Sequence, residues 1–150
     1  RYPQIACVLE PGAAVVYDAG YLVGRVLEVM ENDGVWSAIL DISANCHVPD
    51  VIKTGLNLPV LNARDAGVLE HTYTLVGRTC MARDVWGDYS FAAPLQAGHP
   101  IIIQDALQYS LAEANWFNGH PRPSLGWLRK DGDYEQFRTF DYTDFKYNCG

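Results

Sequence analysis

Residues 21–42 read YLVGRVLEVMENDGVWSAILDI and give the clearest indication of the class of fold. Two runs rich in aliphatic residues, 21–30 and 35–42, lie on either side of the turn Asn32-Asp33-Gly34. Asp-Gly favours a two-residue hairpin turn, because these residue types tolerate the positive φ angles that such a turn needs. The stretch therefore predicts two antiparallel strands joined by a tight turn.

The segments outside this hairpin also favour strands. Residues 5–9, IACVL, form a short apolar run that ends at Glu10-Pro11-Gly12. Such a run is typical of a strand buried on both faces in a parallel sheet. A second hairpin is predicted around Lys130-Asp131-Gly132-Asp133. Further strands are expected at 14–17, 50–54, 70–76 and 100–103.

One helix is expected among these strands. Asp105 can cap its start, and Asn118-Gly119 can end it. The predicted fold is mainly β, a barrel or sandwich with one helix, preceded by one strand that belongs to another element.

Composition limits the classes of function. The 150 residues suit one domain, or one domain and a fragment of another, and are too few for a complete (β/α)8 barrel of roughly 250 residues. The formal net charge of −7 argues against a nucleic-acid partner, and no apolar run approaches the roughly 20 residues of a membrane span. The cysteines form no CxxC pair and no metal-ligand cluster, so we expect no metal. We expect free thiols of a reducing cytoplasm, which in most positions are small buried residues.

Four segments together carry a resemblance to a known family. They are LEPG (9–12), DISANCHVPD (41–50), GRTCMARD (77–84), and Tyr109 with FNG (117–119). In this order and at this spacing they resemble the C-terminal half of fold-type III pyridoxal-phosphate decarboxylases, which include ornithine, arginine and diaminopimelate decarboxylases. The HVPD segment and the FDYTDF ending (140–145) resemble in particular the carboxynorspermidine/carboxyspermidine decarboxylases.

This resemblance implies a division of the chain. Residues 1–12 would be the last strand of an otherwise absent (β/α)8 barrel, and 13–104 a β-domain. Residues 105–119 would be a helix returning to the barrel, and 120–150 C-terminal strands completing the β-domain. The absent barrel portion would carry the cofactor lysine and the phosphate loop, so we expect the chain alone to be inactive.

The resemblance also implies a pyridoxal 5′-phosphate site. Glu10 would hydrogen-bond the pyridine nitrogen of the cofactor, and Gly12 would let the backbone approach it closely. Tyr109 would contact the phosphate or the ring. Relatives of the ornithine type carry an arginine where this chain has Ala13, which removes one phosphate contact. Without the resemblance, these residues would be a loop acid, a turn glycine and a packing tyrosine.

Cys80 is the implied catalytic residue. In relatives the corresponding cysteine reaches across a dimer interface and returns a proton to the α-carbon after decarboxylation. Met81 replaces an acid that recognises short substrates in other members, which suits a longer substrate with a methylene chain. Arg83 stands where relatives usually have glycine. The alternative role for Cys80 is that of a buried structural thiol.

Five residues are implied substrate contacts. Asp50 would bind the distal amine of the substrate, and Asp84 would be a second acid facing an amine from the partner subunit. His47, Phe117 and Asn118 would line the same pocket. The alternatives are a turn aspartate, a loop aspartate, a structural histidine and a core phenylalanine.

The resemblance therefore implies a cytoplasmic homodimer with shared active sites, which decarboxylates carboxynorspermidine or carboxyspermidine to norspermidine or spermidine. Three alternatives remain open. The protein could be another basic amino-acid decarboxylase of the same fold, or a non-catalytic homologue that binds a partner. It could also be an isolated ligand-binding β-domain.

Overall fold

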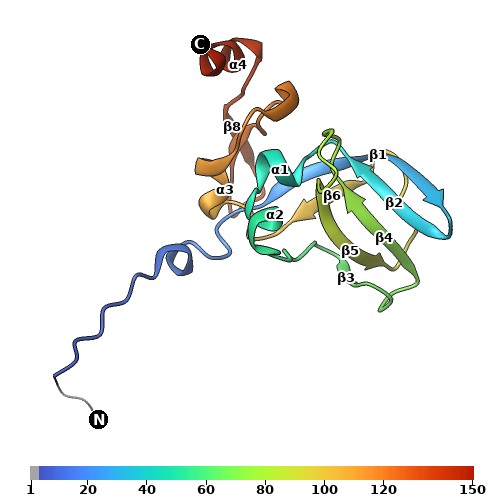
Figure 1. Cartoon of the computed structure of the whole chain (residues 1–150), viewed down its shortest axis with the longest axis horizontal. Coiled ribbons are helices and arrows are strands. Elements are labelled where there is room, and N and C mark those ends of the chain that lie inside the picture. The colour runs from blue at the N-terminus through green and yellow to red at the C-terminus, as the bar shows by residue number, and fades with distance from the viewer. Residues whose placement is uncertain (1–3) are drawn as a thin grey trace.

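The computed structural model describes residues 4–150, which contain a curled six-stranded sheet of order β3-β5-β4-β2-β1-β6 and a separate two-stranded sheet (Figure 1). Neighbouring strands of the large sheet are antiparallel, except that β2 and β4 are parallel. The strands are β1 (Leu22–Asn32), β2 (Val35–Leu40), β3 (Ala63–Asp65), β4 (His71–Val76), β5 (Val85–Phe91) and β6 (Pro100–Ile103).

The two edges of the large sheet meet. Val60, just before β3, forms an isolated antiparallel bridge with Ile103 of β6. The Leu61 N–H donates to the Ile102 carbonyl at 2.9 Å, and the Gln104 N–H donates to the Pro59 carbonyl at 2.8 Å. Because these contacts join the outer strands, the sheet closes into a barrel. The prediction of a mainly β fold is confirmed.

The β1–β2 hairpin forms as its sequence predicts. Its turn residues Asp33 and Gly34 have φ of 52° and 82°, the positive values that a two-residue hairpin turn requires. Alternate residues of β1, such as Leu22 and Val26, are buried, while Val23 faces solvent. This period of two directs one face of the strand into the barrel.

The core fills the inside of the barrel. Its largest fully buried aliphatic side chains come from β2, β4 and β6, so distant parts of the sequence meet there. They are Leu40, Leu75, Ile101 and Ile103.

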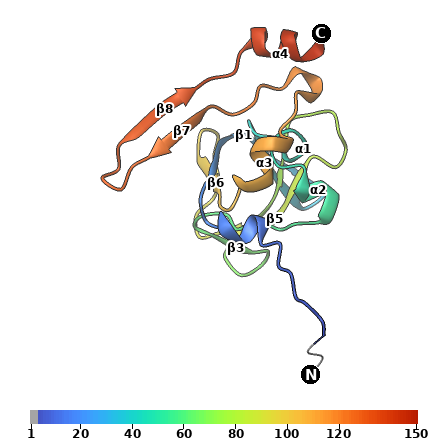
Figure 2. The same ribbon diagram turned by 90° about the vertical axis from the view of Figure 1, so that its left-hand side faces the viewer.

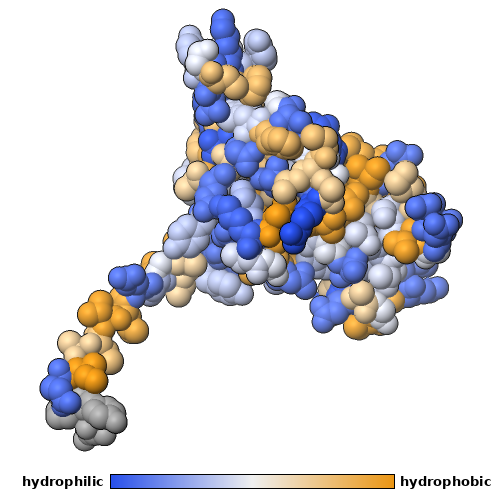
Figure 3. Space-filling view, viewed as in Figure 1, coloured by the Kyte–Doolittle hydropathy of each residue, from blue (hydrophilic) through white to orange (hydrophobic). Residues whose placement is uncertain are grey.

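Residues 5–9 do not form the predicted buried strand. Ile5, Val8 and Leu9 are exposed, and no strand of the described chain pairs with this segment. Figures 1 and 3 show it leaving the body of the molecule as an arm with apolar side chains. A strand buried on both faces needs neighbouring strands, and residues 4–150 supply none at this point. Residues 1–3 of the implied barrel segment lie outside the described residues.

Two further strand predictions were wrong. Residues 14–17 lie in and after a 3-10 turn, η1 (Gly12–Val15), in which the Ala14 N–H donates to the Pro11 carbonyl at 2.7 Å. Residues 50–54 form a helix, α2 (Asp50–Thr54). Pro49 precedes this helix with helical backbone angles, and Gly55 ends it at φ 73°. Proline at a helix start and glycine just after its end outweigh the β-branched residues between them.

The predicted long helix is shorter than expected. Helix α3 (Gln108–Glu113) begins after Leu107, and Asp105 does not cap it. Asp105 has φ 54°, and its carboxylate accepts the Asp18 N–H at 2.6 Å instead. The helix ends where Ala114 takes ψ 133°, and the turn η2 (Phe117–Gly119) follows separately.

The C-terminal segment extends beyond the barrel (Figure 2). The predicted second hairpin forms from β7 (Leu125–Leu128) and β8 (Tyr134–Arg138), but these strands make a sheet of their own. Helix α4 (Tyr142–Cys149), which the sequence analysis missed, starts with a capping box between Asp141 and Asp144.

The cysteines differ in burial from the expectation. All four are free and lie among the described residues. Cys46 is buried, whereas Cys7, Cys80 and Cys149 are exposed.

Candidate active site

A short buried helix, α1 (Ala44–His47), organises the candidate site. Ser43 precedes it with extended backbone angles, and its hydroxyl accepts the Cys46 N–H at 3.1 Å. Serine in this position satisfies a donor that the first helical turn leaves free. The helix lies between the β4–β5 loop and the segment after α3, and it contacts both.

The carboxylate of Asp84 joins the β4–β5 loop to α1. Asp84 is 3% exposed, and its carboxylate accepts hydrogen bonds from two donor groups on each side. From the α1 side, the Ser43 hydroxyl donates at 2.9 Å and the Asn45 N–H at 3.2 Å. From the loop, the Thr79 hydroxyl donates at 2.6 Å and the Thr79 N–H at 3.1 Å. Donors of the chain itself thus surround this carboxylate, and Asp84 joins the loop to α1.

Cys80 lies at the exposed part of the same loop. Its backbone N–H donates to Asn118 Oδ1 at 3.1 Å. Asn118 belongs to η2 and has φ 59°. Cys80 and Asn118 are 38 residues apart in sequence, and the fold brings them into direct contact.

The segment that carries Asn118 is attached to α1. The Asn115 N–H donates to the Cys46 carbonyl at 2.9 Å, and the Asn115 side-chain amide donates to the Asn45 carbonyl at 2.8 Å. The Cys46 thiol lies 3.6 Å from the Phe117 carbonyl oxygen. Phe117 itself is half exposed beside Asn118. Helix α1 therefore holds both partners of the Cys80–Asn118 contact.

His47 is buried at the end of α1. It is 4% exposed, its Nδ1 accepts the Ser43 N–H at 3.2 Å, and its Nε2 lies 3.1 Å from the Pro121 carbonyl. These contacts assign the neutral tautomer with the proton on Nε2. Burial lowers the pKa of His47 from 6.5 to about 4, and the nearby His120 ring adds to this effect. A neutral imidazole packed this way links α1 to Pro121.

The predicted cofactor residues Gly12 and Tyr109 are brought together at another place. A Cβ built on Gly12 would lie 3.0 Å from the Tyr109 hydroxyl oxygen. Tyr109 is 55% exposed, and within residues 4–150 its hydroxyl has no hydrogen-bond partner. Glu10 is exposed on the arm two residues before Gly12. The absence of a side chain at Gly12 therefore allows the Tyr109 hydroxyl to approach this backbone closely.

Asp50 stands apart from both groups. It is half-buried in the first turn of α2, and its backbone carbonyl accepts the Thr54 hydroxyl at 2.8 Å. Lys53 of the same helix pairs with Glu113 of α3 at 2.6 Å. Figures 1 and 2 both place the β4–β5 loop away from η1, the short blue turn at the end of the arm. The predicted residues therefore form two separate groups, one around the Cys80–Asn118 contact and one around the Gly12–Tyr109 contact.

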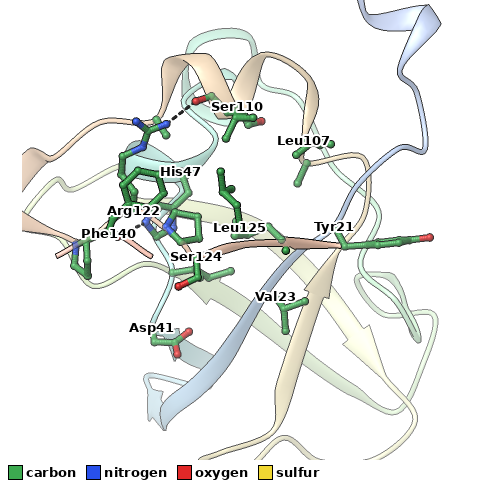
Figure 4. A pocket seen from close by; sticks show the side chains of 18 of the residues that line it. Tyr21, Val23, Asp41, His47, Leu107, Ser110, Arg122, Ser124, Leu125 and Phe140 are labelled. Carbon is green, nitrogen blue, oxygen red and sulfur yellow. Dashed lines mark hydrogen bonds between the residues drawn. The ribbon is translucent and has the colours of Figure 1, made fainter. Parts of the chain in front are cut away.

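A cavity of about 450 Å³ lies between β1, α3 and the start of β7 (Figure 4). Arg122 crosses it, with its guanidinium 4.9 Å from the centre of the Phe140 ring and donating to the Leu111 carbonyl at 2.6 Å. Of the predicted site residues, only His47 lines this cavity. This cavity is therefore not the predicted site.

Sequence reasoning missed several residues that hold the site together. Ser43 could have been found, because a serine before ANCH has the pattern of a helix cap. Thr79 and Asn115 had no such signal, since their partners lie on other elements.

Within the described chain there is neither a membrane-spanning helix nor a metal-binding cluster. No helix within residues 4–150 is long and apolar enough to cross a membrane. No group of three or more histidine, cysteine, aspartate or glutamate side chains within that range is arranged to hold a metal ion.

Residues 13–106 match the family model of the pyridoxal-dependent decarboxylases, in its C-terminal sheet domain. The chain belongs to this family. The match covers the closed barrel from η1 to the residues just after β6, and it confirms the resemblance inferred from the four motifs.

Curated relatives of this decarboxylase family match along the whole chain. Carboxyaminopropylagmatine decarboxylase of Synechocystis sp. is 35% identical over 150 residues, which are 100% of this chain and 39% of the relative. Carboxynorspermidine/carboxyspermidine decarboxylase of Campylobacter jejuni is 36% identical, over 91% of this chain and 38% of the relative. The chain thus spans about two fifths of the length of these relatives.

Solved structures of the family agree with the fold. Carboxynorspermidine decarboxylase of Campylobacter jejuni, crystallised with norspermidine, superposes with a TM-score of 0.85 at 34% identity, over 91% of this chain and 40% of that one. A diaminopimelate decarboxylase of M. jannaschii superposes with a TM-score of 0.72 at 22% identity, over 88% of this chain and 30% of that one. The second likeness supports the fold alone.

Proposed function

We propose that the protein containing this chain decarboxylates a carboxylated polyamine with pyridoxal 5′-phosphate. The observation that carries the proposal is the exposed Cys80, held by Asn118 in a chain that superposes on a carboxynorspermidine decarboxylase with a TM-score of 0.85. The chain would be the C-terminal portion of that protein. In the proposed division, residues 1–12 form the last strand of the cofactor-binding barrel and residues 13–104 form the β-domain. Residues 105–119 return to the barrel, and residues 120–150 hold the C-terminal strands.

The geometry around Gly12 fits the cofactor. The bare backbone of Gly12 faces the free hydroxyl of Tyr109, which would donate to a phosphate oxygen or contact the ring. Glu10, exposed on the arm, would hold a proton on the pyridine nitrogen. The cofactor, when bound, supplies the electron sink that makes loss of carbon dioxide feasible. The exposed apolar residues Ile5, Val8 and Leu9 are what the last strand of a barrel would present to its neighbours.

Cys80 would act as the proton donor. Loss of carbon dioxide leaves an electron pair on the α-carbon of the substrate, and the thiol would give its proton to that carbon. A C–H bond forms, the S–H bond breaks and a thiolate remains. The β4–β5 loop and η1 lie apart in both ribbon views (Figures 1 and 2), which supports a dimer in which Cys80 serves the active site of the partner subunit.

The substrate would be a long amine. Asp50 is half-buried and would pair with a distal ammonium group, for which a partly desolvated carboxylate is a suitable partner. Met81, next to Cys80, offers no charge to a short amino acid and suits a methylene chain. Three substrates are favoured, since relatives named for carboxynorspermidine/carboxyspermidine and for carboxyaminopropylagmatine match at nearly equal identity. Free thiols in all four cysteines suit the proposed cytoplasmic location.

Carbon dioxide release by the full-length protein tests the proposal. The substrates are carboxynorspermidine, carboxyspermidine, carboxyaminopropylagmatine, ornithine and diaminopimelate, each with wild type, Cys80→Ala and the control Cys149→Ala. We expect release from a carboxylated polyamine, strongly reduced in Cys80→Ala and unchanged in Cys149→Ala. Release from a short amino acid alone would refute the substrate class. Failure to bind the cofactor would favour a non-catalytic homologue.

A further inference from the structure

We propose that Asp84 and Asn118 are positioning residues for Cys80, a role that the motif comparison gave to neither. The inference rests on the proposed function, because it assigns a purpose to the exact placement of the Cys80 thiol. Asp84 fixes the shape of the β4–β5 loop, and Asn118 fixes the backbone of Cys80 within it.

The loop of residues 77–84 is closed at its base. The Gly77 N–H donates to the Asp84 carbonyl at 2.7 Å, and the Asp84 N–H donates to the Met81 carbonyl at 2.9 Å. A Cβ on Gly77 would lie 2.2 Å from Asp84 Oδ2, so only glycine allows the carboxylate to pack there. The loop is therefore folded around the Asp84 carboxylate.

This carboxylate is also attached to the rigid body of the protein. Its donors Ser43 and Asn45 belong to the start of α1, whose residues Ser43 and Cys46 are fully buried. Buried carboxylates are stable only when hydrogen bonds replace water, and here donors from both α1 and the loop do so. The loop cannot move relative to α1 without breaking hydrogen bonds to a buried acceptor.

Asn118 holds the loop from the opposite side. Its φ of 59° is in the left-handed region, which asparagine tolerates better than most residues but which still costs free energy. In this conformation its Oδ1 accepts the N–H of Cys80. Asn118 thus combines a residue type that tolerates this conformation with a side chain that holds the backbone of Cys80.

These contacts restrict the position of the Cys80 thiol. The Cys80 side chain is free to meet a substrate, while its own backbone is held by Asn118 and its neighbour Thr79 by Asp84. Proton transfer depends steeply on distance and angle, and a displacement of about 1 Å can cost roughly 100-fold in rate. A thiol on an unrestrained exposed loop would lose much of that rate.

Amide hydrogen exchange of the full-length protein tests the two contacts without depending on turnover. Asn118→Gly keeps the positive φ but removes the acceptor, and Asn118→Asp restores an acceptor oxygen. We expect Cys80 amide exchange to accelerate several-fold in Asn118→Gly and to return toward wild type in Asn118→Asp. The matched control Asn62→Gly replaces another asparagine at positive φ, 63°, and leaves Cys80 exchange unchanged. Unchanged Cys80 exchange in Asn118→Gly would overturn the Asn118 contact.

The Asp84 contact is tested on the Thr79 amide. Asp84→Asn and the milder Thr79→Val each remove part of the hydrogen-bond set, so that one remains measurable if the other does not fold. We expect faster exchange at the amides of the loop, with Asp88→Asn as the exposed control. If the loop amides exchanged as slowly in Thr79→Val and Asp84→Asn as in wild type, the role of Asp84 would be overturned.

Turnover in double variants then tests positioning. Asn118→Gly should lower kcat with wild-type Cys80 by on the order of tenfold, with little change in KM. In a Cys80→Ala background it should change kcat by less than about twofold, because a residue acting through Cys80 has nothing left to position. An equal loss in both backgrounds would overturn the proposal. A fully active Cys80→Ala would instead overturn the proposed function, with the exchange data still deciding whether the loop is held.

Discussion

Gly12 and Tyr109, 97 residues apart in sequence, lie so close that a single added methyl group on Gly12 would come within 3.0 Å of the tyrosine hydroxyl. This contact joins η1, at the end of the exposed arm, to the first turn of α3. It is the one place where two predicted cofactor residues meet within the described chain.

The first prediction follows from this contact. Gly12→Ala should push the Tyr109 hydroxyl from its position and lower the affinity of the full-length protein for pyridoxal 5′-phosphate by roughly tenfold, or about 1.4 kcal/mol. Equilibrium dialysis against the cofactor measures the change. Ala14→Ser, in the same turn and exposed, is the control. Affinity in Gly12→Ala equal to that of wild type would show that this backbone is not at the cofactor.

The second prediction concerns stability against pH. His47 has a pKa of about 4 in the folded chain and an ordinary value near 6.5 when unfolded, so the unfolded state takes up the proton first. The stabilisation is fully present above about pH 6.5 and is lost as the pH falls toward about 4, with a total of roughly 3 kcal/mol at 1.36 kcal/mol per pKa unit. Urea unfolding between pH 8 and pH 4 measures this slope. His47→Gln should flatten it, and an equally steep slope in that variant would assign the effect to other groups.

The third prediction concerns Ser43. Its hydroxyl both caps α1 and donates to the buried Asp84, so Ser43→Ala should lower the free energy of unfolding by about 2–3 kcal/mol. Ser124→Ala, at an exposed position, should change it by less than about 0.5 kcal/mol. Chemical denaturation of both variants provides the comparison. A loss below 1 kcal/mol in Ser43→Ala would mean that another donor replaces the hydroxyl.

The fourth prediction concerns the core. Leu75 is fully buried in the barrel, so Leu75→Ala should cost about 2–5 kcal/mol through lost burial and a residual cavity. Leu56→Ala, at a 42% exposed position, should cost far less. Thermal unfolding of the two variants measures the difference, and similar midpoints would contradict the assignment of Leu75 to the core.

The sequence by itself determined the features that depend on neighbouring residues. Asp33-Gly34 encodes its own turn, and the aliphatic-rich run 21–30 favours the strand that precedes it. The motif segments, taken in order, pointed to the family that the comparisons confirm. Such information is local or shared among relatives, and it does not require knowledge of which segments pack together.

Tertiary structure decided the rest. Residues 5–9 have the composition of a buried strand, but a strand exists only where another strand supplies hydrogen bonds, and none in the described chain does. Residues 50–54 are an exception, because Pro49 and Gly55 are local signals that outweigh the β propensity of the residues between them. Asp84 looked like an exposed acid in GRTCMARD and became a buried acceptor, because its donors Ser43 and Asn45 lie about 40 residues earlier in the chain. The Cys80–Asn118 contact arose in the same way, since only folding brings a loop and a turn of such different sequence position within hydrogen-bond distance.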